Sequence, residues 1–310
     1  MKMMKKTVNP NKIREGSRVA DFLVYALTVF VILITLYPMY YVVIMSVSDQ
    51  VDVLARDVYL YPTDFQFSAY EYVMKDDALW RSLGYSAFYA IVTTVLQLFF
   101  CVTFGYALAM PKLAGRTFFV WYLIIPMYFG GGLIPTFLVM TKILGLYNSI
   151  WSIILPGATS VWYIILTRTF FYSSVPHSLR EAALIDGANH YKTLFHIYLP
   201  LSKPILAVIA IYTIVNIWNS WFNASIYLMD ARLHPVQMYL KSFLIDSTDA
   251  SNSVAAALSP EEAEELFRAT MVKSQLQYAV IVITTLPVLV VYPFLQKYFV
   301  KGVMIGSLKG

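Results

Sequence analysis

The sequence contains little cysteine and little charge. Cys101 is its single cysteine, so it supports neither a disulfide framework nor a thiolate metal site. Charged residues make up 13% of the 310 positions, whereas soluble domains have about 25%. The chain has no G-x-x-x-x-G-K-[ST] stretch and no Gly-Lys pair, which excludes a P-loop that holds nucleotide phosphates.

Apolar residues dominate instead, at 59% of the chain with a mean hydropathy of +0.62. A helix needs about 20 apolar residues to cross the hydrocarbon core of a bilayer. Six segments reach that length, at 22–45, 85–110, 117–140, 150–171, 204–229 and 278–296. We therefore predict an all-α, polytopic membrane protein with six transmembrane helices, the first of which is an uncleaved span.

Basic residues are distributed unevenly between the predicted loops. The amino-terminal arm, the second and fourth connections and the tail together hold 14 Lys and Arg, and the three opposite loops hold eight although they are longer. Those opposite loops carry 14 of the 18 acids. The positive-inside rule therefore places both termini and the fourth connection in the cytoplasm. The net charge of +5 is thus a sign of orientation and not of nucleic-acid binding.

The spans divide the chain into four parts. Residues 1–21 form a basic cytoplasmic arm, 22–84 the first span with an extracytoplasmic loop, 85–296 a core domain and 297–310 a cytoplasmic tail. The core contains a cytoplasmic loop at 172–203 and an extracytoplasmic loop at 230–277. In the latter loop, Ser259 and Glu262 form a capping box beside Pro260, which predicts a surface helix over 260–271.

The third span contains several helix breakers within ten positions, namely Pro126, Gly130, Gly131, Gly132 and Pro135. Proline removes a backbone donor and glycine removes stiffness, so we do not expect a regular helix. Broken backbone at membrane depth persists only where protein or a water-filled cavity surrounds it. We therefore expect this span to face the interior of the bundle. The alternative is a kink that only improves packing.

The fourth connection resembles a helix from a soluble protein. Ser178 and Glu181 form a capping box after Pro176, which predicts a helix that begins near residue 179. An apolar stripe follows at helical offsets of 0, 4, 7 and 11, made of Leu184, Ala188, Tyr191 and Phe195. Gly187 permits a bend or a close backbone approach. Few basic residues accompany the stripe, which disfavours a bilayer-surface helix and leaves packing on this protein or docking onto a partner.

The fifth span carries amides at helical spacing, Asn216, Asn219 and Asn223, interleaved with Trp218 and Trp221. Unpaired amides are costly in lipid, so we expect them to point into the bundle. Amides beside aromatic faces suit sugars, which present hydroxyls at their edges and C–H patches on their faces. The alternative is that the amides join helices and that the tryptophans mark the membrane interface.

The segment EAALIDGANHYKTLFHIYLP resembles the EAA loop of permease subunits of binding-protein-dependent ABC importers. The resemblance rests on Glu181-Ala182-Ala183, Gly187 and the later Ile197, Leu199 and Pro200. EAALIDGA together with LPLSKP is similar to the carbohydrate branch, to its maltose-type second permease and above all to its lipoprotein-binding, complex-oligosaccharide group. The stretches GGGLIPTFLVM, NIWNSWFNASIYL and YPFLQKYFVKGVMIGSLKG agree with this group.

The resemblance implies a coupling helix that sits in a cleft of an ATP-binding subunit. The coupling residues would be Glu181, Ala182, Ala183, Asp186, Gly187, Ala188, Tyr191, Phe195, Leu199 and Pro200. A competing role for Glu181 is that it only caps its helix. The tail at 301–310 would reach into the ATPase dimer or would be a plain flexible tail.

The same resemblance implies the assembly around the chain. It would pair with a second homologous permease, two ATP-binding cassette subunits and an extracytoplasmic solute-binding lipoprotein in the lipid of a bacterial cytoplasmic membrane. ATP and Mg would bind the partner ATPase, so we expect no cofactor, metal or enzymatic activity in this chain. An oligosaccharide would pass residues of spans three and five, namely Gly130, Gly131, Gly132, Asn216, Trp218, Asn219, Trp221 and Asn223.

Two other functions make different demands on the sequence. A secondary transporter driven by an ion gradient would need paired ionisable groups near mid-membrane. The six spans contain only Arg168, which we expect to reach the cytoplasm at the end of span four. An intramembrane enzyme would need clustered His, Asp or Ser at membrane depth, but all four histidines fall in predicted loops.

Overall fold

The structure, a computed structural model, describes residues 18–253, 271–291 and 293. These residues form helices and no strand. Four helices are long and apolar enough to cross a membrane, at Val19–Ser46, Asp77–Ala109, Trp151–Ser174 and Met271–Val291, and two bent helix pairs raise the number of candidate spans among the described residues to six. The predicted all-α membrane fold is therefore confirmed, with a counterpart for each predicted span.

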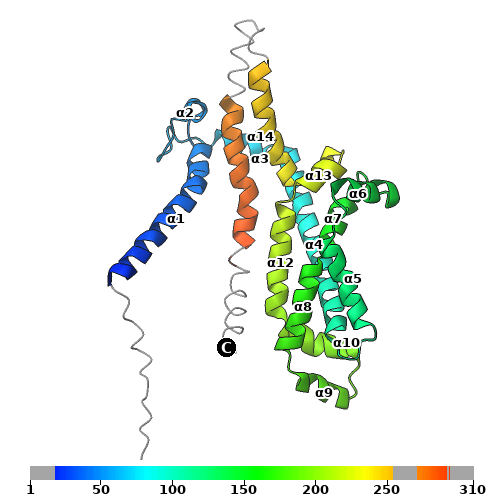
Figure 1. Cartoon of the computed structure of the whole chain (residues 1–310). Helices are drawn as coiled ribbons and strands as arrows, with labels where there is room; N and C mark the ends of the chain where they lie inside the picture. Colours follow the sequence, from blue (N-terminus) through cyan, green and yellow to red (C-terminus); the bar gives the residue numbers. More distant parts are fainter. Residues whose placement is uncertain (1–17, 254–270, 292, 294–310) are drawn as a thin grey trace, which may run out of the picture.

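The first span stands apart from the other helices. α1 (Arg18–Ser46) lies on the far side of helix Met271–Val291 from the bundle of α4, α8 and α12 (Figure 1). Its apolar side chains are exposed over most of its length. It meets the rest of the chain at its carboxyl end, where Ile44 and Met45 pack with residues that follow it. The short helices α2 (Gln50–Ala55) and α3 (Ser68–Met74) occupy the loop beyond it.

The second span is the central element of the bundle. α4 (Asp77–Ala109) packs against α7 (Trp151–Ala158), α8 (Val161–Ser174), α12 (Lys203–Trp218) and α14 (Val236–Ser253). It begins eight residues before the predicted start because Asp76 caps it, accepting a hydrogen bond from the amide of Ala78. Gly105 lets α4 approach α8 closely, since a Cβ there would lie 2.9 Å from Cγ2 of Thr167.

The third span is broken, as the sequence predicts. α5 (Arg116–Tyr128) and α6 (Leu133–Leu138), the latter continued by the π-helix η2 (Val139–Ile143), meet at an angle of 114°. Gly132 sits between them with a φ of +83°, a conformation that favours glycine. The helix therefore stops where the glycine run begins.

The fifth span differs from its prediction. A helical stretch made of α10 (His190–Thr193), the π-helix η3 (Leu194–Tyr198) and α11 (Leu199–Leu201) meets α12 at 76°. α12 then ends at Trp218, and a separate short helix, α13 (Phe222–Tyr227), follows. The prediction of one regular span over 204–229 is therefore wrong.

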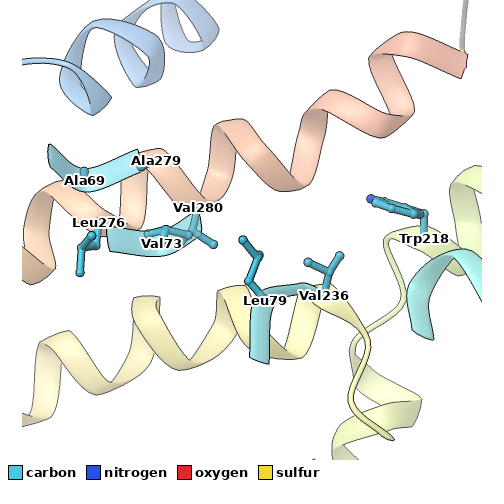
Figure 2. Close-up of a cluster of buried hydrophobic side chains, with 8 residues drawn as sticks. All are labelled: Ala69, Val73, Leu79, Trp218, Val236, Leu276, Ala279 and Val280. Carbon is cyan, nitrogen blue, oxygen red and sulfur yellow. The ribbon is translucent and has the colours of Figure 1, made fainter. Parts of the chain in front are cut away.

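A cluster of apolar side chains joins the loops to the spans. It contains Ala69 and Val73 of α3, Leu79 of α4, Trp218 of α12, Val236 of α14, and Leu276, Ala279 and Val280 of the last helix (Figure 2). α14 follows the short 3-10 helix η4 (Ala231–Leu233) and was not predicted. The predicted surface helix at 260–271 lies outside the described residues except for its last position. The amino-terminal arm up to residue 17 and the tail also lie outside them.

Candidate functional site

The predicted amphipathic segment begins as a helix, but not by the predicted cap. α9 (His177–Ile185) starts two residues before the predicted position, with Pro176 at its cap and no side-chain hydrogen bond there. Ser178 and Glu181 therefore lie inside the first two turns, and the capping-box prediction is wrong. Proline fixes the backbone before the helix and is sufficient to start it. Glu181 is exposed and is free of the competing capping role.

The helix ends at Gly187 in a Schellman motif. The amide of Gly187 donates to the carbonyl of Leu184 at 3.1 Å, and the amide of Ala188 donates to the carbonyl of Ala183 at 2.8 Å. Gly187 has a φ of +72°, which L side chains adopt only with strain. Asn189 then caps α10, its side chain accepting from the Lys192 amide. The predicted bend at Gly187 is confirmed, but the single continuous stripe is wrong because two helices carry its residues.

Most of the predicted stripe faces away from the protein. Exposed fractions are 53% for Leu184, 76% for Tyr191 and 56% for Phe195, and the neighbouring Ile185 reaches 86%. Ala188 is half-buried. Self-packing, one of the two alternatives for the stripe, therefore does not describe these side chains. We call the surface formed by Glu181, Ala182, Leu184, Ile185, Asp186, Gly187, Tyr191 and Phe195 the coupling surface.

The opposite side of the same segment is anchored to the membrane helices. Leu194 and Tyr198 of η3 pack with Val102, Tyr106, Ala109, Met110, Phe171 and Val175 of the spans. The Tyr198 ring meets the edges of Tyr106 and Phe171, with centroids 5.0 and 5.3 Å apart. The Tyr106 hydroxyl lies 3.3 Å from Nδ1 of His190. Ala183 is buried, and Leu199 is half-buried while Pro200 is exposed.

The acidic groups of the coupling surface are unpaired among the described residues. Glu181 and Asp186 are exposed, and neither carboxylate forms a salt bridge with any residue that the structure describes. An exposed carboxylate pair beside apolar side chains is typical of a surface that meets basic and apolar groups of another protein.

The glycine run of span three is not covered by the described residues. Gly130, Gly131 and Gly132 are exposed, and neither α5 nor α6 has a buried side chain. The prediction that the break faces the interior of this chain's own bundle is therefore wrong among the described residues. Sequence reasoning identified the break but not the exposure of its glycines.

The predicted sugar-facing residues of span five do not converge. Trp218 is buried in the cluster of Figure 2, where its Nε1–H donates to the carbonyl of Thr284 at 3.1 Å. Trp221 is exposed, and Nζ of Lys241 lies 4.5 Å from its ring centroid. Asn219 is the exposed cap of α12, and Asn223 lies half-buried in α13. The break after Trp218 places these groups in different surroundings.

Asn216 alone of these residues lines a cavity of about 270 Å³, whose lining mixes polar side chains with Pro156, Trp162 and Ile217. The other polar side chains of its lining include Gln97 of α4, Thr159 and Ser160 between α7 and α8, and Tyr163 of α8. Sequence reasoning missed them. The signal was present, because Pro156 and Gly157 sit just before the α7–α8 break and mark it as a second irregular span.

Six spans, two of them bent, and an anchored surface helix between spans four and five define a membrane permease. Residues 102–305 match the family of binding-protein-dependent transport system inner membrane components, and the chain belongs to this family. The predicted permease class is thereby confirmed, and the family favours an importer subunit over a transporter driven by an ion gradient. Its members are transport proteins of the inner membrane.

Several known proteins are similar over almost the full chain. Protein LplC of Bacillus subtilis (strain 168) is 39% identical over 280 residues, which cover 89% of this chain and 90% of that protein. The polygalacturonan/rhamnogalacturonan transport system permease protein YtcP of the same organism is 36% identical over 298 residues, which cover 95% and 99%. A crystal structure of a bacterial ABC transporter involved in the import of the acidic polysaccharide alginate contains a chain with a TM-score of 0.80 and 34% identity, which covers 92% of this chain and 98% of that one.

Proposed function

We propose that the chain forms half of the translocation pathway of an ATP-driven importer for oligosaccharides that an extracytoplasmic solute-binding lipoprotein delivers. Two relatives support the substrate class, because their names and titles concern polygalacturonan, rhamnogalacturonan and alginate. The partner subunits follow from the family, whose members work with binding proteins. ATP and Mg bind the two ATPase subunits in this proposal.

One observation carries the proposal: the coupling surface is exposed on one side and anchored on the other. Leu184, Ile185 and Tyr191 are exposed, and a water-facing loop gains nothing by exposing a large apolar area unless another molecule covers it. Glu181 and Asp186 add two carboxylates for basic groups of the ATP-binding subunit. Ala182 has a small side chain and Gly187 has none, which permits the ATP-binding subunit to approach the backbone closely.

The anchor explains how force would reach the membrane. The Tyr106, Phe171 and Tyr198 rings interlock α4, α8 and η3, and the Tyr106 hydroxyl contacts His190 of α10. Packed aromatic side chains resist deformation, so a displacement of the coupling surface would move the helices as rigid bodies. Closure of the ATPase dimer would thus swing the bundle between its inward-open and outward-open states.

The exposed break in span three identifies where the second permease would sit. Lipid cannot satisfy the backbone of Gly130 to Gly132, so protein or the water-filled pathway must cover it. We place the homologous permease against α5 and α6, with the glycine run beside the pathway. The unequal distribution of basic residues supports a bacterial cytoplasmic membrane with both termini in the cytoplasm.

The cavity that Asn216 lines is our candidate sugar contact. Asn216, Ser160, Thr159 and Tyr163 supply donors and acceptors within one lining. Asn216→Leu should raise the KM for uptake with little effect on thermal stability, because the side chain is exposed. Trp218→Phe should lower thermal stability and leave the KM unchanged, because its indole donates to a backbone carbonyl in the core. A raised KM in Trp218→Phe with an unchanged KM in Asn216→Leu would indicate that the tryptophan contacts the sugar instead.

Cross-linking tests the docking of the coupling surface. Cys101 is buried, so a Cys101→Ala background leaves no competing thiol. Ile185→Cys in the reconstituted transporter should form a nucleotide-sensitive cross-link to the ATPase, because Ile185 is 86% exposed at the coupling surface. Lys142→Cys, exposed in η2 at the opposite end of the bundle (Figure 1), is the matched control and should give none. A cross-link at position 142 with none at 185 would contradict the proposed orientation and docking.

A further inference from the structure

An apolar groove lies between the second half of α4 and the first half of α5. It has a volume of about 460 Å³. Its floor is the buried Leu108, and its walls include Phe104 and Phe119, each 45% exposed. The lining is aliphatic and aromatic along its whole length, and it also includes Ala107, Tyr122 and Leu123. Such a groove on the outside of a membrane bundle is open to acyl chains.

A basic rim closes one end of this groove. Lys112 and Arg116 lie in and directly after the short connection between α4 and α5, with Lys112 exposed and Arg116 half-buried. Arg168 of α8 donates from Nε to the carbonyl of Leu108, the floor residue, at 3.4 Å. The Arg168 side chain is thus held at the end of α4, and its extension to the cytoplasm stays a prediction. Arg116 and Arg168 are close enough for their charges to repel each other.

No acid among the described residues is paired with this rim. Residues 78–180 contain no Asp and no Glu. None of Lys112, Arg116 and Arg168 forms a salt bridge with the residues that the structure describes. Three cations at one end of an apolar groove are complementary to one kind of molecule, an amphiphile with an anionic head and a hydrocarbon tail.

We propose that this groove binds an anionic phospholipid of the cytoplasmic leaflet. An acyl chain would lie between α4 and α5, and the phosphate would meet Lys112 and Arg116. Basic pockets between transmembrane helices at the cytoplasmic face bind such head groups. The assignment of the lipid to the cytoplasmic leaflet depends on the orientation given under the proposed function. The proposed binding of an anionic lipid depends only on the groove and its basic rim.

The position of the groove gives the lipid a role. Phe104 and Leu108 flank Tyr106, whose ring and hydroxyl belong to the anchor of the coupling surface. The two sets of contacts are on different faces of the same turns of α4. A lipid in the groove would therefore stabilise the end of α4 that receives force from the ATPase.

The test is selective lipid retention by the assembled transporter. The purified complex is incubated with equimolar dioleoyl phosphatidylglycerol and dioleoyl phosphatidylcholine, and retained lipids are counted by native mass spectrometry. We expect phosphatidylglycerol to be retained preferentially. Lys112→Gln and Arg116→Gln should each weaken retention about fivefold, the factor that one basic residue near an anionic head group contributes. Arg116→Lys should largely preserve it.

Matched variants separate the groove from general charge effects. Lys75→Gln and Lys142→Gln each remove one positive charge at an exposed position elsewhere and should change nothing. Ala107→Phe fills the groove without a charge change and should abolish retention. Glycerol phosphate in excess should not displace the lipid, since it lacks the acyl chain.

Three results would overturn the proposal. One is equal retention of both lipids, and another is displacement by glycerol phosphate alone, which would indicate a simple anion site. The third is loss of the second permease from the complex on Ala107→Phe, which would show that protein fills the groove. None of these outcomes depends on the cross-link at residue 185, so failure of the lipid site and failure of ATPase docking are distinguishable.

Discussion

Gly187 offers a direct test of close seating at the coupling surface. Its φ of +72° ends α9, and a Cβ built on it meets no atom within 4 Å. A side chain there consequently strains the backbone without a clash inside this chain. Gly187→Ala should therefore cost about 1 kcal/mol of stability, and Gly187→Asn less, because asparagine tolerates the left-handed region. Such a loss lowers the melting temperature of a domain by about 2–4 °C.

The effect in the assembled transporter should be much larger. If the ATP-binding subunit seats against the glycine, an added side chain overpacks the interface at a cost of about 1–3 kcal/mol. That cost corresponds to a loss of docking of roughly 5- to 150-fold. Alanine should thus cost about 1 kcal/mol, and asparagine less, in the isolated permease, while both should impair docking in the complex. Gly187→Asp adds a charge and should uncouple most strongly, as should Glu181→Lys.

The assay compares two measurements on each variant. Thermal unfolding of the isolated permease reports the backbone cost, and sugar uptake together with ATP hydrolysis in proteoliposomes reports coupling. Gly145→Asn is the matched control, because Gly145 has a φ of +65° and equally open surroundings in a different loop. Normal coupled uptake by both Gly187→Ala and Gly187→Asn would refute close seating. Equal loss in Gly145→Asn would show that the effect is not specific to the coupling surface.

Two further predictions concern the scaffold. Gly105→Ala should lower the free energy of unfolding by about 1–3 kcal/mol, because its Cβ would lie 2.9 Å from the Thr167 side chain. Gly84→Ala on the same helix has open space around it and should be neutral or stabilising. Equal effects of the two substitutions would refute the close α4–α8 contact. Burial and the 2.7 Å hydrogen bond to Asp76 raise the pKa of Tyr239 above its ordinary value of 10, so melting temperatures of the wild type should fall as the pH rises above about 10, where the unfolded state loses the proton first. Tyr239→Phe should be less stable at neutral pH, and its melting temperature should fall less steeply above about pH 10 than that of the wild type. Parallel curves of melting temperature against pH would show that this hydrogen bond does not cause the decline.

The spans could be predicted from the sequence because lipid imposes a simple requirement on length and polarity. The break in span three was also predictable, since three consecutive glycines between two prolines leave little alternative to a broken helix. The predicted start and length of the amphipathic helix were wrong because a second local sequence signal lies close to each signal that we used. Pro176 starts α9 before the Ser178 capping box can act, and the Schellman turn at Gly187 divides the apolar stripe between two helices.

Long-range contacts account for the other errors. The spacing of Trp218 and Asn216 predicts the same surroundings for both. The Trp218 indole instead donates a hydrogen bond to the carbonyl of Thr284, 66 residues later in the last described helix, and so does not line the cavity. The surroundings of Gly130 to Gly132 involve another subunit in our proposal, so periodicity within one chain cannot supply them. The coupling residues are predicted by resemblance, and the structure adds the packing around Tyr106 that holds the segment against the spans.

The bend of 76° between α11 and α12 turns the fifth span into a lever. From Lys203 to Asn216 the helix rises by about 20 Å, so a tilt of about 10° at the bend would sweep the far end sideways by roughly 3–4 Å. Ser202, which lies between the two arms, is fully buried. A small rotation beneath the membrane would therefore become a lateral stroke beside the cavity that Asn216 lines.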